Sequence, residues 1–142
     1  DAAHVDGVLG VGTPKRRFVQ EPHQFILGIA LSEASADAAP LVIWEGSHRI
    51  MHRVFAQALA GIDQPEEVDV TDVYVAARKI CFDTCKRVAV PLPVGGAVLL
   101  HRMALHGVAP WQPQAHAAPE GRMIAYFRPE IEGGAAAWIA GA

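Results

Sequence analysis

The residues that decide the fold run from Val88 to His101 and read Val-Ala-Val-Pro-Leu-Pro-Val-Gly-Gly-Ala-Val-Leu-Leu-His. Two short apolar runs, 88–92 and 97–101, flank a turn rich in proline and glycine at Pro93 to Gly96. Apolar runs of this length between such turns are typical of buried β-strands. The stretch therefore predicts two neighbouring strands.

The same pattern recurs on both sides of this stretch. Residues 24–31 are nearly all apolar, and the apolar run 41–44 follows after an alanine-rich turn, so we expect these two segments to form a hairpin. Met123 to Arg128 is a further extended segment. The strands do not alternate with helices as they do in doubly wound parallel sheets. We therefore predict a mainly β, mostly antiparallel protein with a jelly roll or cupin-like barrel as its architecture.

Two helices are expected as insertions between the strands. Ser47 is placed to cap a helix from about His48 to Ala60, which would end at Gly61. Thr71 or Asp69 would begin a second helix that continues to about Phe82.

The chain length of 142 residues suits one domain. We assign residues 1–130 to the domain core and residues 131–142 to a tail rich in glycine and alanine. The chain begins with Asp1 rather than Met, and a candidate ligand already stands at position 4. We therefore expect an N-terminally incomplete domain.

Composition argues against several classes of partner. The formal net charge is −3 and the twelve basic residues form no dense stripe, so we expect neither nucleic acid nor a membrane surface as partner. No apolar run approaches the roughly 18 residues that span a bilayer. We expect a cytoplasmic protein that acts on a small molecule. Because 51% of the residues are hydrophobic, we also expect a docking partner, for which a second copy forming a homo-oligomer is one candidate.

A short motif near the N-terminus brings two metal-binding side chains together. His4 and Asp6 are two residues apart, and strand side chains repeat every two residues, so both would point to the same face of one strand. A second histidine from a distant strand would complete a set of two histidines and one carboxylate. That facial triad is typical of non-haem Fe(II) oxygenases, because it leaves metal positions open for co-substrate and oxygen.

Two histidines compete for the third ligand position. His101 and His106 are five residues apart, so on one regular strand they would face opposite sides. We favour His106, because it precedes Gly107 and a proline-containing turn near a rim. His101 would then have a structural role, or it would contact a metal ligand without binding the metal itself.

An anionic co-substrate needs a fixed cation, and the planar guanidinium of arginine suits a carboxylate. Arg122 is the candidate, and Arg128 on the same strand face is its rival. The two lie on the order of 20 Å apart along an extended strand, so both cannot bind one carboxylate.

Together these motifs resemble the phytanoyl-CoA dioxygenase family of Fe(II)- and 2-oxoglutarate-dependent oxygenases. The family pattern is His-x-Asp, then Gly-Ser-His, then a distal His-Gly, then Arg. It matches His4 to Asp6, Gly46 to His48, His106 with Gly107, and Arg122, in that order. The resemblance covers the chain from His4 to about Pro129. Val108 and Gly96 depart from the family pattern.

The resemblance implies a double-stranded β-helix with Fe(II) and 2-oxoglutarate as cofactors. It implies that His4, Asp6 and His106 bind the iron and that Arg122 holds 2-oxoglutarate. The reaction would be hydroxylation of a small organic substrate with molecular oxygen. Related halogenases lack the carboxylate ligand, so Asp6 favours hydroxylation.

Two alternative functions are also consistent with this sequence. A cupin-like domain could bind another metal or a small metabolite without 2-oxoglutarate chemistry, since a fold does not determine function. His48 and His52, at i and i+4 of the expected helix, could share a metal, although Arg49 stands where helical zinc proteases have glutamate.

Trp111 is a weaker candidate for substrate contact, and His23 and His116 are interpreted as surface or loop residues.

Overall fold

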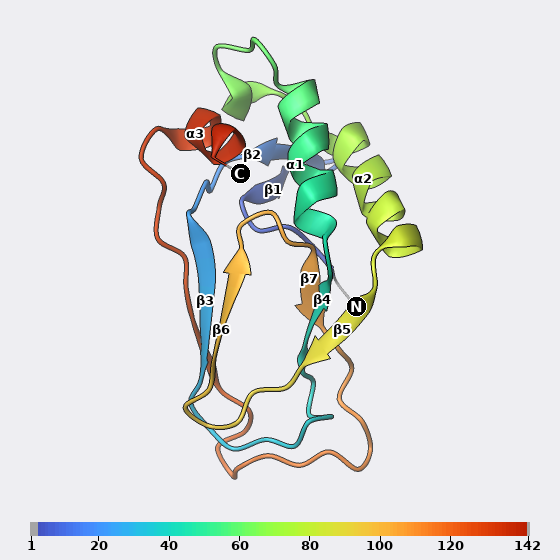
Figure 1. Ribbon diagram of the computed structural model, residues 1–142, viewed down its shortest axis with the longest axis vertical. Coiled ribbons are helices and arrows are strands. Elements are labelled where there is room, and N and C mark those ends of the chain that lie inside the picture. The colour runs from blue at the N-terminus through green and yellow to red at the C-terminus, as the bar shows by residue number, and fades with distance from the viewer. Residues whose placement is uncertain (1–2, 142) are drawn as a thin grey trace.

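The computed structural model describes residues 3–141, which form antiparallel sheets with helices gathered at one end (Figure 1). The strands are β1 (Val8–Val11), β2 (Arg16–Val19), β3 (Phe25–Ala30), β4 (Leu41–Trp44), β5 (Arg87–Val90), β6 (Ala97–His101), β7 (His106–Val108) and β8 (Ile124–Phe127). The helices are α1 (Ser47–Ala58), the short 3-10 helix η1 (Pro65–Glu67), α2 (Thr71–Thr84) and α3 (Gly134–Ala140). The expectation of a mainly β, antiparallel protein is confirmed. Among the described residues, no helix is both long and apolar enough to cross a membrane.

The strands form three separate sheets. One has the order β6-β3-β8, a second has the order β5-β4-β7, and β1 pairs with β2. In the first sheet Ile26 of β3 lies opposite Leu100, and in the second Val42 of β4 lies between Ala89 and Gly107. β3 and β4 are therefore the central strands of two different sheets.

This arrangement corrects the expected hairpin between residues 24–31 and 41–44. β3 is bonded on one side to β6 and on the other to β8, so no edge of β3 remains for β4. The connection instead crosses from one sheet to the other, and backbone bridges join Ala34 to Ala117 and Ala38 to Trp111 on the way.

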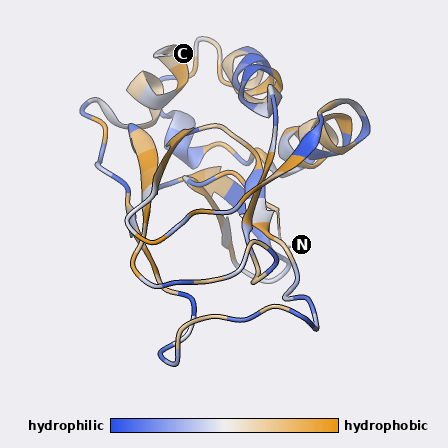
Figure 2. Ribbon diagram, turned by 60° about the horizontal axis from the view of Figure 1, so that its bottom comes forward, coloured by the Kyte–Doolittle hydropathy of each residue, from blue (hydrophilic) through white to orange (hydrophobic). Residues whose placement is uncertain are grey.

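The two three-stranded sheets contact each other through buried aliphatic side chains. Ile26 of β3 and Leu100 of β6 cluster with Leu41 of β4. Figure 2 shows that hydrophobic residues concentrate in the strands, while the loops brought forward in this view contain many hydrophilic positions. Burial of these apolar side chains between the two sheets favours folding.

A second, larger core joins the helices to the ends of the sheets. Met51 and Phe55 of α1 pack with Tyr74 and Cys81 of α2. The indole of Trp138 in α3 lies beside the Phe55 ring, with 5.6 Å between the ring centroids, and is 0% exposed. The segment expected to be a tail, residues 131–142, thus contains a helix that completes the core, although position 142 lies outside the described residues.

The start of α1 differs from the expected capping by Ser47. Gly46 is the N-cap residue, with a φ of 80° that glycine adopts readily. Ser47 is instead buried, and its Oγ accepts a hydrogen bond of 2.9 Å from the backbone N–H of Leu105. Ser47 therefore attaches the helix to the segment that leads into β7.

The start of α2 agrees with the expectation that Asp69 or Thr71 begins a helix. The Asp69 carboxylate accepts a hydrogen bond of 2.9 Å from the backbone N–H of Thr71 and another from its hydroxyl. Arg16 donates to the same carboxylate from β2. The contact between Arg16 and Asp69 therefore attaches the start of α2 to the small β1-β2 sheet.

Candidate metal centre

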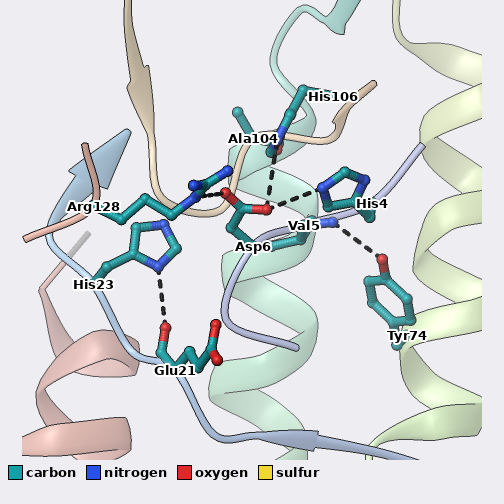
Figure 3. Close-up of polar contacts among 9 residues, drawn as sticks. All are labelled: His4, Val5, Asp6, Glu21, His23, Tyr74, Ala104, His106 and Arg128. Carbon is teal, nitrogen blue, oxygen red and sulfur yellow. Dashed lines mark hydrogen bonds and ion pairs between the residues drawn. The ribbon is translucent and has the colours of Figure 1, made fainter. Parts of the chain in front are cut away.

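His4, Asp6 and His106 converge at one point of the structure (Figure 3). One potential ligand atom from each side chain lies within 4.8 Å of the other two. The distance from Asp6 Oδ1 to His4 Nε2 is 3.0 Å, and that to His106 Nε2 is 3.7 Å. The structure thus brings together the three residues that the sequence singled out.

The backbone around His4 explains how the first two side chains come to share a face. His4 and His106 form an antiparallel bridge with backbone hydrogen bonds of 2.8 and 3.0 Å. Val5 points to the opposite side, where it is buried in the main core, and its N–H donates to the Tyr74 hydroxyl at 3.1 Å. Gly7, with a φ of 90°, then turns the chain away. The two-residue alternation expected of a strand is present, although only one bridge supports it.

His106 is held in place from both sides. Its neighbour Leu105 is fully buried, and the Leu105 carbonyl accepts a hydrogen bond of 3.0 Å from the N–H of Trp44. The His106 ring lies with Nδ1 2.9 Å from the carbonyl oxygen of Ala104. A carbonyl only accepts, so Nδ1 carries the hydrogen and the Nε2 lone pair faces Asp6. Burial lowers the pKa of His106, which keeps the ring neutral and able to bind a metal.

Asp6 is the electrostatic centre of the group. Its side chain is only 10% exposed, and Arg128 Nε donates a hydrogen bond to Oδ2. Burial alone would raise the pKa of Asp6, but hydrogen bonds from His4 and Arg128 and the positive charge nearby lower the pKa well below its usual range. The carboxylate is therefore ionised, with Oδ2 held by Arg128 and Oδ1 turned toward both histidines.

The donor set suits a divalent transition metal. Ligand atoms in adjacent positions around such an ion lie about 3 Å apart, because each is about 2.0–2.2 Å from the metal. The separation of His4 Nε2 and Asp6 Oδ1 already has this value, and the ligand atoms, all within 4.8 Å of one another, would move closer around an ion. The His106 ring also carries the outer hydrogen bond that commonly orients a histidine ligand.

His101 lies away from this group, but for a different reason than the sequence suggested. β6 ends at His101, residues 102–105 cross to the other sheet, and His106 begins β7. The two histidines are thus not on one strand, and the argument from opposite faces does not apply. The His101 ring contacts that of His48, with centroids 4.9 Å apart.

The structure brings Arg128 rather than Arg122 to the ligand group. Arg122 precedes the first residue of β8, Ile124, which pairs with Ala30 at the far end of β3. There it lines a cavity of about 10 Å³ beside Ser32. Trp111, the weaker candidate for substrate contact, is half exposed in a loop and pairs through its backbone with Ala38.

Sequence reasoning missed His23, which was expected at the surface. The residue is only 3% exposed, and its Nδ1 donates to the Glu21 carbonyl at 3.1 Å. Its Nε2 has no hydrogen-bond partner among residues 3–141. The side chains of His23 and Arg128 lie beside each other (Figure 3). Both line a cavity of about 440 Å³. A single histidine after proline carries no sequence pattern that would have indicated this position.

Comparison with protein-family models, with characterised proteins and with solved structures finds no match to this chain. Membership of the phytanoyl-CoA dioxygenase family therefore stays a prediction that rests on the order of the motifs.

Proposed function

We propose that this protein is a non-haem Fe(II)- and 2-oxoglutarate-dependent dioxygenase that hydroxylates a small organic substrate. The observation that carries the proposal is the convergence of His4, Asp6 and His106. Two imidazoles and one carboxylate are the protein ligands of non-haem iron oxygenases with open coordination positions. The order of motifs along the chain supports the same class.

Fe(II) with 2-oxoglutarate and oxygen supplies the oxidising power to hydroxylate a C–H bond. The residues of this chain would hold the ion and keep one side of it accessible. The side chains of His106 and Asp6 are 7% and 10% exposed, whereas the His4 side chain is 52% exposed. We infer that the accessible side lies toward His4 and that substrate enters there.

Arg128 would orient the carboxylate ligand. By holding Oδ2 of Asp6, it leaves Oδ1 for a single bond to the metal. Residues that hydrogen bond to a metal ligand commonly change metal affinity by 10- to 100-fold. In this assignment Arg128 is a positioning residue.

Arg122 is the residue whose place in the order of motifs suggests a role in binding the distal carboxylate of 2-oxoglutarate. Arg128 contacts Asp6, and Arg122 lies on the order of 20 Å from Arg128 along the extended segment. The five-carbon chain of 2-oxoglutarate is far shorter than this distance, and the cavity beside Arg122 is about 10 Å³, which is room for about one water. Arg122 would therefore reach a 2-oxoglutarate that chelates the iron only if β8 and the loop beside it moved.

The architecture that we propose is a double-stranded β-helix core. Two three-stranded antiparallel sheets that contact each other through Ile26, Leu41 and Leu100 support it. The metal ligands would then lie at one end of the space between the sheets, with His106 contributed by the edge strand β7.

One observation favours a second candidate function. Because the cavity beside Arg122 is too small for a dicarboxylate, the chain could hold a metal or a small metabolite in a cupin-like domain without 2-oxoglutarate chemistry. The two functions differ in whether 2-oxoglutarate binds to the iron-loaded protein.

The deciding experiment is an anaerobic titration of the Fe(II)-loaded protein with 2-oxoglutarate, followed by visible absorption. A charge-transfer band that saturates would support the oxygenase, because it requires the keto acid to chelate the iron. Stoichiometric iron without this band would favour the cupin-like domain. Failure to bind iron at all would contradict the oxygenase proposal.

A further inference from the structure

A further cavity lies along α1 and is not lined by the candidate metal ligands. It has a volume of about 720 Å³, within the range of small-molecule sites. One face of α1 and His101 of β6 line it, and none of His4, Asp6 and His106 does. Its chemistry is therefore separate from that of the candidate metal centre.

The surface of the cavity is mostly apolar, and two arginines are among the residues that line it. Arg49 and Arg53 line it one helical turn apart, and no described lining residue is acidic. Neither arginine forms an ion pair with another described residue. Two cationic side chains thus lie at the cavity without a carboxylate among its described lining residues.

Three histidines also line the cavity. His48 and His52 lie on the same face of α1, and the His48 ring contacts His101. The Nδ1 atom of His101 accepts a hydrogen bond of 3.1 Å from the N–H of Met103, so the hydrogen of the neutral ring lies on Nε2. His101 therefore presents a donor, as the two arginines do.

A metal ion fits this cavity less well than an anion. His52 Nε2 already donates to the Ile139 carbonyl at 2.9 Å. Among residues 3–141, the group that could hold a metal with three ligands is the one formed by His4, Asp6 and His106. Arg49 and Arg53 would also repel a cation.

We propose that this cavity binds an organic oxyanion, a phosphate or carboxylate group carried on an apolar body. Arg49, Arg53 and His101 would hold the anionic group through charge-assisted hydrogen bonds. Ala56 and Ala60, which line the same cavity, would contact the apolar part. The volume exceeds what an inorganic anion fills, which is why the ligand needs such a body.

The test is a titration of the metal-free full chain with hexyl phosphate, hexanoate and hexan-1-ol, followed by calorimetry and by the histidine side-chain resonances in NMR spectra. We expect saturable binding of at least one anion with a shift of the His101 resonance. The double variant Arg49→Gln/Arg53→Gln should bind at least tenfold more weakly, whereas Lys79→Gln, an exposed cation on α2, should bind within twofold of the unmodified chain.

Each outcome of these titrations either supports or overturns the proposed anion site. Tighter binding of hexyl phosphate assigns the site to phosphate esters, and tighter binding of hexanoate assigns it to carboxylates. The proposal is overturned if neither anion binds at millimolar concentration, if hexan-1-ol binds equally well, or if the double variant binds unchanged. Because Arg49 and Arg53 are exposed, their replacement should leave the circular dichroism spectrum unchanged. No iron is present, so the result is independent of the oxygenase proposal.

Discussion

The Nε2 atom of His106 lies 3.7 Å from Oδ1 of Asp6, although the two residues come from distant parts of the chain. The backbone bridge between His4 and His106 creates this proximity, because it aligns the N-terminal segment with the start of β7. The candidate metal centre therefore depends on one pairing of chain segments, and its ligands can be tested one by one.

Replacement of His106 should remove the metal site. We expect His106→Ala to lower Fe(II) affinity at least 100-fold, because the remaining His4 and Asp6 supply only two ligands. Anaerobic calorimetry with Fe(II) measures this. His101→Ala is the matched control and should retain stoichiometric binding, since His101 contacts His48 instead. The reverse pattern would show that His101 is the ligand.

Replacement of Arg128 should weaken the site without removing it. Arg128→Gln loses the charged donor to Oδ2 of Asp6, so we expect Fe(II) affinity to fall about tenfold. Anaerobic calorimetry with Fe(II) measures this change in affinity as well. An unchanged or increased affinity would mean that Arg128 competes with the metal for Asp6 rather than orienting it.

Replacement of Arg122 tests whether this residue reaches the co-substrate. Because Arg122 lies on the order of 20 Å along the extended segment from Arg128, which contacts Asp6, we expect Arg122→Gln to bind Fe(II) and 2-oxoglutarate as the unmodified chain does. The intensity of the charge-transfer band against 2-oxoglutarate concentration gives the affinity. A tenfold weaker affinity for 2-oxoglutarate would show that β8 moves to bring Arg122 to the iron.

His101 should make stability depend on pH in the mildly acidic range. Burial, with His48, Arg102 and His52 nearby, lowers its pKa to about 4, against about 6.5 in the unfolded chain. Between these values the unfolded chain binds a proton that the folded chain does not, so the free energy of unfolding falls as pH decreases from 6.5 toward 4.

The variant His101→Asn isolates this contribution, since asparagine can still accept the hydrogen bond from Met103. Urea unfolding at pH 7 and pH 5 should show a smaller loss of stability in the variant. Because the ring is only partly buried, the difference should be on the order of 1 kcal/mol or less. Equal losses in both proteins would exclude His101 as the source.

Ser47 should be more important for stability than its place at a helix start suggests. Ser47→Ala would leave the buried N–H of Leu105 without an acceptor, so we expect a loss of about 1–3 kcal/mol in the free energy of unfolding. Thr84→Ala is the control, because the Thr84 hydroxyl is exposed at the end of α2 and its loss should change stability far less. Similar effects of both substitutions would argue against the attachment of α1 to Leu105.

Several features could be predicted from the sequence because they depend on neighbouring residues. The apolar runs bounded by proline and glycine correctly indicated β3, β4, β5 and β6. The alternation around Val5 placed His4 and Asp6 on one face, with Val5 in the core. These properties follow from the two-residue period of a strand, which the order of side chains already contains.

Other features could not be predicted, because they depend on which segments meet. The expected hairpin of β3 and β4 failed because β3 bonds to β6 and β8 on its two edges. Trp138 lies in a segment too rich in glycine and alanine to suggest a core helix, yet its indole is buried beside the Phe55 ring of α1. The residues next to Trp138 in the sequence give no indication that it will be buried there.

The amino-acid sequence by itself determined the strand segments, the antiparallel β class and the three residues proposed as metal ligands. Only the tertiary structure decided that Arg128 reaches Asp6, that His101 joins His48, and that Ser47 bonds to Leu105. The physical reason is range: backbone preference and side-chain alternation act over a few residues, whereas these contacts form only after the strands have paired and the helices have packed against them.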